Sequence, residues 1–205
     1  MILYHGTNFS AAMNIVNNGI DLSCSQPFLD FGPGFYATPD YYHAAVTAIR
    51  KTDKYNRIYK VNERPYIVKI DFQMSDDVNL VSYDGDDVKW GEFVLNNRLS
   101  KELLDTYSII EHNQDLKYDI CYGGIADGKI IRIARSVNLK ECTPYDIKFT
   151  DFLKNNKQEL KKQYSFHTEK SLACIKILSG ETIKNENKYR DRIIERRAKY
   201  DKRRY

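Results

Sequence analysis

Short apolar runs, separated irregularly by amphipathic segments, restrict the fold of this chain more than any other feature of its sequence. These runs predict strands over residues 2–4, 35–37, 66–72, 118–125, 164–166 and 175–178. Apolar residues at helical spacing predict helices after residues 10 and 38, over 88–96 and 151–162, and near the C-terminus. Elements mixed in this order predict an α+β domain rather than a doubly wound parallel sheet.

Capping and turn residues set the expected boundaries of these elements. Residues 6–8 are expected to break the first strand, Ser10 to cap the helix that follows, and Gly19 to end it. Thr38 is expected to cap the next helix, because a proline follows it. Trp90 lies three and four residues before Phe93 and Val94, so the three side chains share one face of the predicted helix. We therefore predict that Trp90 anchors this helix in a core.

The overall composition predicts a globular chain with one core. Its 205 residues, 42% of them hydrophobic, suffice for one domain. We find neither a run of about 18 apolar residues nor the pattern of a secretory signal. The four cysteines, at positions 24, 121, 142 and 174, lack the spacing of a metal site or a disulfide framework. We therefore expect a cytoplasmic protein with reduced thiols, no metal and no membrane contact.

Basic residues accumulate at the C-terminus. The net charge is +4, but residues 184–205 carry ten Lys/Arg and four Asp/Glu, a net +6. This division predicts a domain over residues 1–183 and a basic helical tail over residues 184–205. With Tyr189, Tyr200 and Tyr205 among its cations, the tail suits an acidic partner, either nucleic acid or an acidic protein. A solvated helix without a partner is the alternative.

Three local clusters combine polar or aromatic side chains with strands or glycine turns. They lie at residues 4–7, 32–38 and 163–166. Each has a structural explanation when taken alone: His5 as a strand-end cap, Tyr36 as a core residue, and Gln163 as the last residue of a helix. Their order along the chain favours a shared functional site.

The ordered set resembles the His-Tyr-Glu motif of the ADP-ribosyltransferase superfamily, in the branch of diphtheria toxin and the poly(ADP-ribose) polymerases. The corresponding stretches are residues 5–7, 34–36 and 163–166. The chain is also similar to a bacterial family of unknown function with ADP-ribosyltransferase-like folds. Four signatures of that family occur here, at residues 30–36, 90–94, 118–127 and 163–168, and the resemblance spans roughly residues 3–178.

This resemblance implies a split, mostly antiparallel β core with flanking helices and an NAD cleft between two sheets. It also implies roles for the motif residues in binding NAD⁺, which is the substrate. His5 would bind the nicotinamide ribose, the backbone of Gly6 would pair with the carboxamide, and Tyr36 would stack on the nicotinamide ring. The third-motif residue, Gln163, would hold the ribose 2′-hydroxyl. The cofactor-binding set is completed by Thr7, Gly34 and Phe35.

The third motif departs from the superfamily pattern, in which the residue is Glu. Gln163 can orient the ribose through its amide, but it carries no charge to stabilise a cation at the anomeric carbon. An acidic residue elsewhere could supply that charge, and the candidates within the motifs are Asp119, Asp127 and Glu169. Alternatively, the acceptor is a strong nucleophile or the enzyme is slow.

The function implied is transfer of ADP-ribose from NAD⁺ to a macromolecule, with nucleic acid favoured over protein as the acceptor. The biological role implied is toxin-like: an effector, or the toxic member of a toxin–antitoxin or phage-defence pair, with a neutralising protein as partner. The alternatives are an NAD- or ADP-ribose-binding module without turnover and an NAD⁺ glycohydrolase. The RNA 2′-phosphotransferase branch ranks lower, because it uses His and Arg in place of Tyr36 and Gln163.

Overall fold

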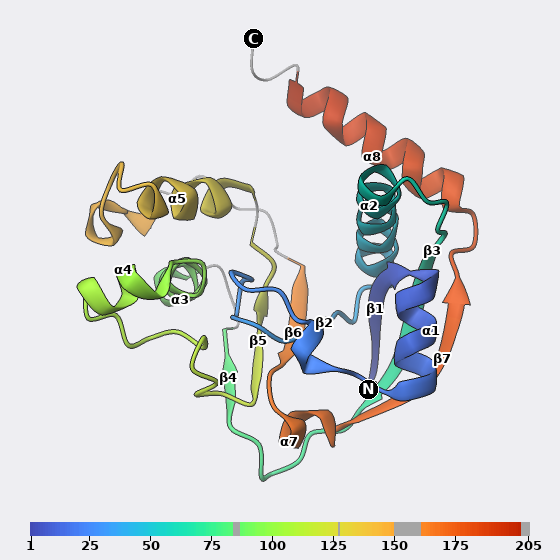
Figure 1. Ribbon diagram of the computed structural model, residues 1–205, viewed down its shortest axis with the longest axis horizontal. Helices are drawn as coiled ribbons and strands as arrows, with labels where there is room; N and C mark the ends of the chain where they lie inside the picture. The colour runs from blue at the N-terminus through green and yellow to red at the C-terminus, as the bar shows by residue number, and fades with distance from the viewer. Residues whose placement is uncertain (84–86, 127, 150–160, 202–205) are drawn as a thin grey trace. The chain divides into compact units, whose positions relative to one another are not determined.

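Two β-sheets, each in its own unit of the chain, organise the fold (Figure 1). The computed structural model describes residues 1–83, 87–126, 128–149 and 161–201. Unit 1 comprises Met1–Ile20, Ala37–Gln73 and Ile175–Tyr205, and unit 2 comprises Asp21–Tyr36 and Met74–Cys174. Both units combine strands with helices, so the predicted α+β class is confirmed.

The sheet of unit 1 contains β1 (Ile2–Asn8), β3 (Pro65–Phe72) and β7 (Ile175–Thr182), in the order β1-β3-β7. Both neighbouring pairs are antiparallel. The central strand β3 is the most apolar of the three, and its Ile67, Val68 and Ile70 are fully buried. Because the central strand is buried on both faces, its apolar pattern is clear in the sequence. The strand predicted over residues 66–72 is confirmed.

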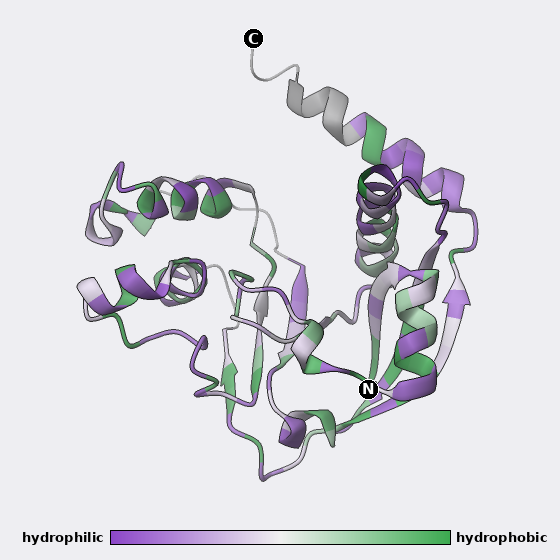
Figure 2. Cartoon of the chain, viewed as in Figure 1, coloured by the Kyte–Doolittle hydropathy of each residue, from purple (hydrophilic) through white to green (hydrophobic). Residues whose placement is uncertain are grey.

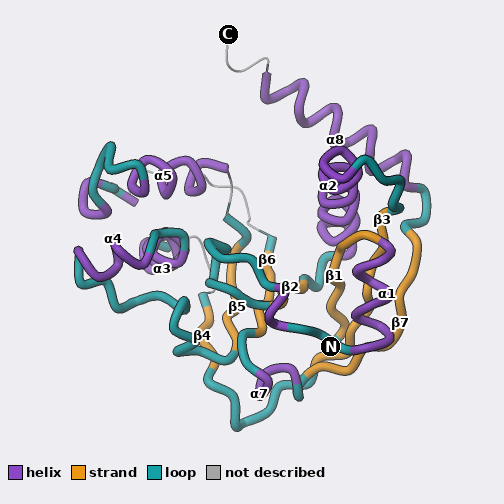
Figure 3. Tube along the Cα trace, in the orientation of Figure 1, coloured by secondary structure: helices purple, strands orange, loops and turns teal. Residues whose placement is uncertain are grey.

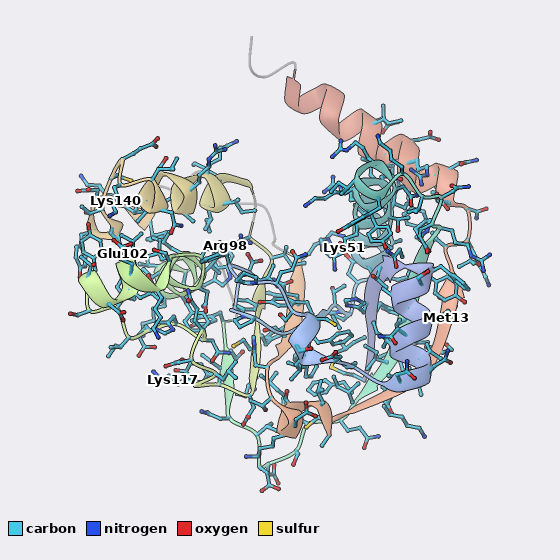
Figure 4. All side chains as sticks on the ribbon, in the orientation of Figure 1. Met13, Lys51, Arg98, Glu102, Lys117 and Lys140 are labelled. Atoms are coloured by element: carbon cyan, nitrogen blue, oxygen red, sulfur yellow. The ribbon has the colours of Figure 1, made fainter. Side chains whose placement is uncertain are left out.

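Helices cover both faces of this sheet. The helix α2 (Tyr41–Tyr59) packs against Ile67, which lies opposite Gly6 in the β1–β3 register. Met13 of α1 (Phe9–Asn18; labelled in Figure 4) approaches Gly180 of β7, which pairs with Val68. Because Ile67 and Val68 are consecutive strand residues, α2 and α1 lie on opposite faces. A third helix, α8 (Glu186–Asp201), packs beside α2.

The element boundaries of unit 1 correct three predictions. Residues 6–8 do not break the first strand, because they continue the β1–β3 ladder, and Asn8 caps α1 through its side chain, which accepts from Ala11 N at 2.9 Å. Ser10 instead bonds to Glu63 through its hydroxyl. Thr38 does not cap α2, because its backbone pairs with Tyr4; Asp40 is the cap and accepts from His43 N at 3.0 Å. Gly19 ends α1, as predicted.

The sheet of unit 2 has the order β2-β6-β5-β4 (orange strands in Figure 3). Its strands are β2 (Phe35–Ala37), β4 (Leu80–Ser82), β5 (Ile120–Gly124) and β6 (Lys162–Phe166). β5 and β6 pair antiparallel, whereas β4 and β5 pair parallel. The last residue of β2, Ala37, begins the second segment of unit 1.

A hydrophobic core of unit 2 lies around α3 (Val88–Asn97). Trp90 is buried there beside Phe31 and Phe93, and its Nε1 donates to Gly124 O at 3.1 Å, which confirms the predicted anchor. The remaining helices of the described part of this unit are α4 (Lys101–Thr106), α5 (Gly128–Asn138), α7 (Glu169–Leu172) and short 3₁₀ turns at Leu22–Cys24 and Pro144–Asp146.

The helix predicted over 151–162 falls largely on residues 150–160, outside the described residues, and Lys162 begins β6. Among the helices that the structure describes, none has both the length and the apolar composition needed to cross a membrane.

Candidate functional site

The first motif lies on β1, an edge strand of the unit 1 sheet. Met1 exchanges backbone hydrogen bonds with Phe72 of β3, at 2.6 and 2.8 Å, whereas Tyr4 exchanges them with Thr38, at 2.8 and 3.0 Å. Backbone groups alternate sides along a strand, so odd-numbered residues of β1 bond to β3 and even-numbered residues face outward. The N–H and C=O of Gly6 therefore point to the outer edge of the sheet, as a donor and an acceptor side by side.

A side chain at position 6 would collide with α2. A Cβ on Gly6 would lie 2.0 Å from Ala44 O and 2.8 Å from Ala48 N. Close packing of α2 on β1 therefore explains the glycine, whereas the family resemblance implied that its backbone pairs with the nicotinamide carboxamide. The outward direction of the Gly6 backbone groups leaves that contact geometrically open.

His5 and Thr7 lie on the opposite face of β1 from Gly6. His5 pairs with Val68 in the register and is half-buried, and Thr7 is buried. Both residues come shortly before the first turn of α1 in the sequence, and both lie on the face of the sheet that α1 approaches. The first motif thus sits at the junction of an edge strand and a helix start in unit 1.

The second motif closes a loop in unit 2. The Tyr36 hydroxyl accepts from Phe31 N at 2.9 Å and donates to Gly32 O at 2.6 Å, and its ring lies nearly parallel to that of Phe31 with centroids 6.4 Å apart. Burial, together with the charge of Asp30, raises the pKa of Tyr36 well above its usual value. The neutral hydroxyl of Tyr36 therefore holds the loop in place. The predicted stacking on nicotinamide would involve only the ring of Tyr36.

Gly34 and Phe35 are positioned by the end of β6, the strand that carries the third motif, and by His167 directly after it. A Cβ on Gly34 would lie 2.6 Å from His167 Nδ1 and 2.7 Å from Phe166 O, so a side chain there would displace the loop. Phe35 is buried against Phe166. His167 Nδ1 lies 2.6 Å from Pro33 O, and Nε2 lies 2.8 Å from Ser165 Oγ.

His167 is neutral in this arrangement. Burial lowers its pKa to about 4, although the carbonyl of Pro33 and the charge of Asp119 oppose the shift. A neutral ring with Nδ1–H donating to Pro33 O and Nε2 accepting from Ser165 Oγ satisfies both contacts. His167 follows the third motif directly, but sequence alone gave no reason to expect that it would hold the glycine loop.

A buried carboxylate, that of Asp30, joins the third motif to the loop before β2. Gln163 Nε2 donates to Asp30 Oδ2 at 2.9 Å, and both side chains are buried. Asp30 Oδ2 also accepts from Ala126 N at 3.0 Å. Arg98, labelled in Figure 4, donates to Asp30 Oδ1 through Nε at 3.1 Å and through Nη2 at 2.5 Å, and to Phe28 O at 2.9 Å.

Asp30 is therefore the carboxylate beside Gln163, a position for which sequence analysis suggested three other residues. Asp119 accepts from Asn79 N at 2.8 Å and from Thr168 Oγ1 at 2.6 Å. These contacts lower the pKa of Asp119 against the opposing effect of its burial and fix the turn before α7. Glu169 is exposed in the first turn of α7, and Asp127 lies outside the described residues.

A polarised amide follows from this geometry. A carboxylate that accepts from the amide N–H increases the negative charge on the amide oxygen, because hydrogen bonds in a chain polarise one another. Gln163 can in this way present more negative charge at Oε1 than an isolated glutamine. Asp30 could have been suspected from the sequence, because it is the first residue of the 30–36 signature. Arg98 lies outside every motif, so nothing in the sequence pointed to it.

The structure thus brings Gly34, Phe35, Tyr36 and Gln163 together within unit 2, where Asp30, Arg98 and His167 join them. His5, Gly6 and Thr7 lie together in unit 1. The sequence-predicted residues therefore form two groups, each held by the core of its own unit.

A comparison with protein families matches residues 1–177 to a family described as "Protein of unknown function (DUF3990)". The match includes all three motifs and ends within β7, so residues 178–205 lie outside it. This agrees with the expected resemblance to a family of unknown function over roughly residues 3–178. No curated protein and no solved structure matches the chain.

Proposed function

This chain belongs to the DUF3990 family, and we propose that it is an NAD⁺-dependent mono-ADP-ribosyltransferase that modifies a macromolecule. The observation that carries the proposal is the hydrogen bond from Gln163 to Asp30. It places a negative charge next to the third-motif residue, where the superfamily pattern has Glu. The resemblance of the three ordered motifs supplies the reaction, and the α+β architecture with two sheets is compatible with it.

The reaction breaks the bond between the nicotinamide nitrogen and the ribose anomeric carbon. Nicotinamide leaves with the bonding electron pair as a neutral molecule, so no general acid is needed. The acceptor nucleophile forms the new bond to the anomeric carbon and releases its proton. The intermediate charge resembles an oxocarbenium ion, as in glycoside hydrolysis, and negative charge placed beforehand stabilises it.

Each motif residue has a role consistent with its contacts. The outward N–H and C=O of Gly6 match the acceptor and donor of a carboxamide, and His5 is proposed to bind the ribose. Tyr36 is proposed to stack on nicotinamide through its ring. Gln163 is proposed to accept from the ribose 2′-hydroxyl at Oε1, while Asp30 fixes the amide through Nε2.

A binding module without turnover is the second candidate, and the Arg98–Asp30 ion pair favours it. Arg98 neutralises part of the charge that Asp30 would contribute. If this effect dominates, the site would hold NAD⁺ or ADP-ribose without cleaving it. A glycohydrolase, in which water is the acceptor, is the third. For the cell we propose a toxin-like role with a neutralising protein partner, as the family resemblance implies.

Incubation with NAD⁺ labelled in its adenylate phosphate, together with a bacterial lysate, separates these candidates. Label in protein, RNA or DNA supports transfer, free ADP-ribose supports hydrolysis, and intact NAD⁺ with measurable binding supports the module. His5→Ala is expected to reduce cleavage at least a hundredfold in the folded protein, since loss of one transition-state contact has about this effect. His112→Ala is the matched control. Cleavage within threefold of wild type in His5→Ala would remove His5 from the site.

A further inference from the structure

The second half of α2 carries a surface that the proposed chemistry does not use. We call it the α2 surface and define it by six exposed residues: Lys54, Tyr55, Arg57, Ile58, Tyr59 and Lys60. Tyr59 is 62% exposed and Ile58 is 55% exposed, which is unusual for large apolar side chains on a well-packed helix. The opposite side of α2 is buried in the unit 1 core.

Helical spacing makes this surface continuous. Arg57 and Ile58 follow Lys54 by three and four residues, so the three side chains share one face. Tyr55 and Tyr59 are four residues apart, and their ring centroids lie 4.6 Å apart at 42°. Lys60 ends the helix in a left-handed conformation. Cations and aromatic rings therefore alternate over a single stretch of the helix.

The cations of the α2 surface have no anionic partner within the described part of the chain. No salt bridge between described residues involves Lys54, Arg57 or Lys60, whereas Arg190 of α8 pairs with both Asp53 and Glu186. Lys54 and Arg57 are like charges three residues apart on the helix and repel each other, while the carboxylate of Asp53, four residues before Arg57, is paired with Arg190. An external polyanion would remove this repulsion.

The helix α8 adds basic residues beside α2 and is held in place by packing. Its Tyr189 ring lies 5.4 Å from that of Tyr42, Arg192 lies 5.4 Å above the Tyr42 ring, and Ile193 is buried in the unit 1 core. Figure 1 shows α8 passing beside α2, and the part of α8 that is coloured by hydropathy in Figure 2 is mostly hydrophilic. Point substitutions therefore test the surface better than truncation, which would expose Ile193.

We propose that the α2 surface binds single-stranded nucleic acid. Cations bind phosphates, and exposed tyrosine rings stack on unpaired bases, which is how sequence-tolerant single-strand binders work. An acidic protein would match the charges but would leave the paired tyrosine rings without stacking partners. That the bound strand is also the acceptor of ADP-ribose rests on the proposed function; the binding itself does not.

The first test measures anisotropy of a fluorescein-labelled 16-nucleotide RNA of mixed sequence at several salt concentrations. Lys54→Gln, Arg57→Gln and Lys60→Gln, combined in one variant, are expected to weaken binding at least tenfold at low salt. The same variant should reduce the slope of log K against log salt by about 2, since three phosphate contacts are lost. The matched control neutralises three exposed lysines of unit 2: Lys89→Gln, Lys101→Gln and Lys148→Gln. Equal weakening in both variants would overturn the proposal.

The second test separates stacking from charge. Tyr55→Ser combined with Tyr59→Ser is expected to weaken RNA binding at least fivefold and leave the salt slope unchanged. A fluorescein-labelled acidic peptide is the competing probe. Tighter binding of the peptide than of RNA, or no RNA binding by the wild type at low salt, would overturn the proposal. Melting temperatures of all variants confirm that they are folded.

The third test keeps this inference apart from the proposed function. NAD⁺ cleavage by the α2-surface charge variant, assayed without acceptor, is expected to match that of the wild type, while transfer to RNA is expected to fall at least tenfold. If the wild type binds RNA but cleaves no NAD⁺, only the proposed function is contradicted. Full transfer to RNA by the charge variant would contradict the role of the surface in acceptor binding.

Discussion

The amide of Gln163 donates to the carboxylate of Asp30 at 2.9 Å, across 133 positions of the sequence. This bond joins β6 to the loop that precedes β2, and Arg98 completes the arrangement with an ion pair to the same carboxylate. The third-motif residue and the second-motif loop are therefore held by one buried anion. A substitution that removes the hydrogen bond between Asp30 and Gln163 therefore affects both the third-motif residue and the loop.

Exchange of the amide and the carboxylate tests this relationship. Asp30→Asn places a donor opposite the Gln163 amide, and Gln163→Glu places a second carboxylate beside Asp30, so one of the two must stay protonated. Each single substitution is expected to reduce NAD⁺ cleavage about a hundredfold. The double variant restores one amide–carboxylate hydrogen bond and is expected to recover at least tenfold over either single variant. Recovery should be partial, because Ala126 N–H would then face an amide nitrogen.

Initial rates of nicotinamide release, with kcat and KM determined separately, measure the recovery. The exposed residue Asp105 supplies the control, as Asp105→Asn. A double variant no better than Asp30→Asn would mean that the bond only stabilises the loop and that Gln163 does not act through Asp30.

The two roles of Tyr36 are separable by substitution. Tyr36→Phe removes the hydroxyl that bonds Phe31 N and Gly32 O, so it is expected to lower the free energy of unfolding by about 1–3 kcal/mol. It keeps the ring and should retain cleavage within fivefold of wild type. Tyr36→Ala removes the ring as well and is expected to reduce cleavage at least a hundredfold. Urea denaturation and nicotinamide release measure the two effects. Equal loss of cleavage in both variants would exclude ring stacking as the main contribution.

Gly6 is expected to tolerate no side chain. Gly6→Ala would bring a Cβ within 2.0 Å of Ala44 O, so α2 must move away from β1. Overpacking of this kind typically destabilises by about 1–3 kcal/mol, and a clash with backbone falls at the upper end. Gly128→Ala is the control, because no described residue lies within 4 Å of a Cβ at that position. A melting temperature of Gly6→Ala equal to that of the control would contradict the close contact between α2 and β1.

Local sequence signals predicted the elements better than their ends or their contacts. The strand over 66–72 and the helix over 88–96 were predictable, because burial imposes a regular apolar pattern on each. Glycine at position 6 signalled a break, yet its environment is set by α2, which lies distant in the sequence. Thr38 resembled a cap, but its backbone is bonded to Tyr4, so the helix begins only at the next available cap, Asp40.

The candidate site shows the same limit. Ordered motifs identified Tyr36 and Gln163, but no pattern in one sequence connects Asp30 or Arg98 to Gln163. Their contact depends on how the loop before β2, the end of α3 and the start of β6 meet in the tertiary structure. A missing charge in a motif was therefore detectable from the sequence, whereas the residue that supplies the charge was not.

Stability is expected to depend on pH through His167. Burial lowers the pKa of this ring to about 4, whereas an unfolded histidine titrates near 6.5. Between these values the unfolded state binds more protons, so stability is fully present above about pH 6.5 and is lost as the pH falls toward 4. The loss amounts to roughly 3 kcal/mol at most, and protonation would place a second donor on Nε2 opposite Ser165 Oγ.

The free energy of unfolding, measured by urea denaturation at half-unit steps from pH 4 to 8, reports this dependence. His167→Asn is expected to lower stability at pH 7, because the contacts to Pro33 and Ser165 are lost, and to flatten the curve below pH 6.5. His112→Gln removes a histidine of unit 2 without touching these contacts and should leave the slope unchanged. If His167→Asn keeps the full acid slope, the ring does not link proton binding to folding, and other groups that titrate in this range must account for the loss.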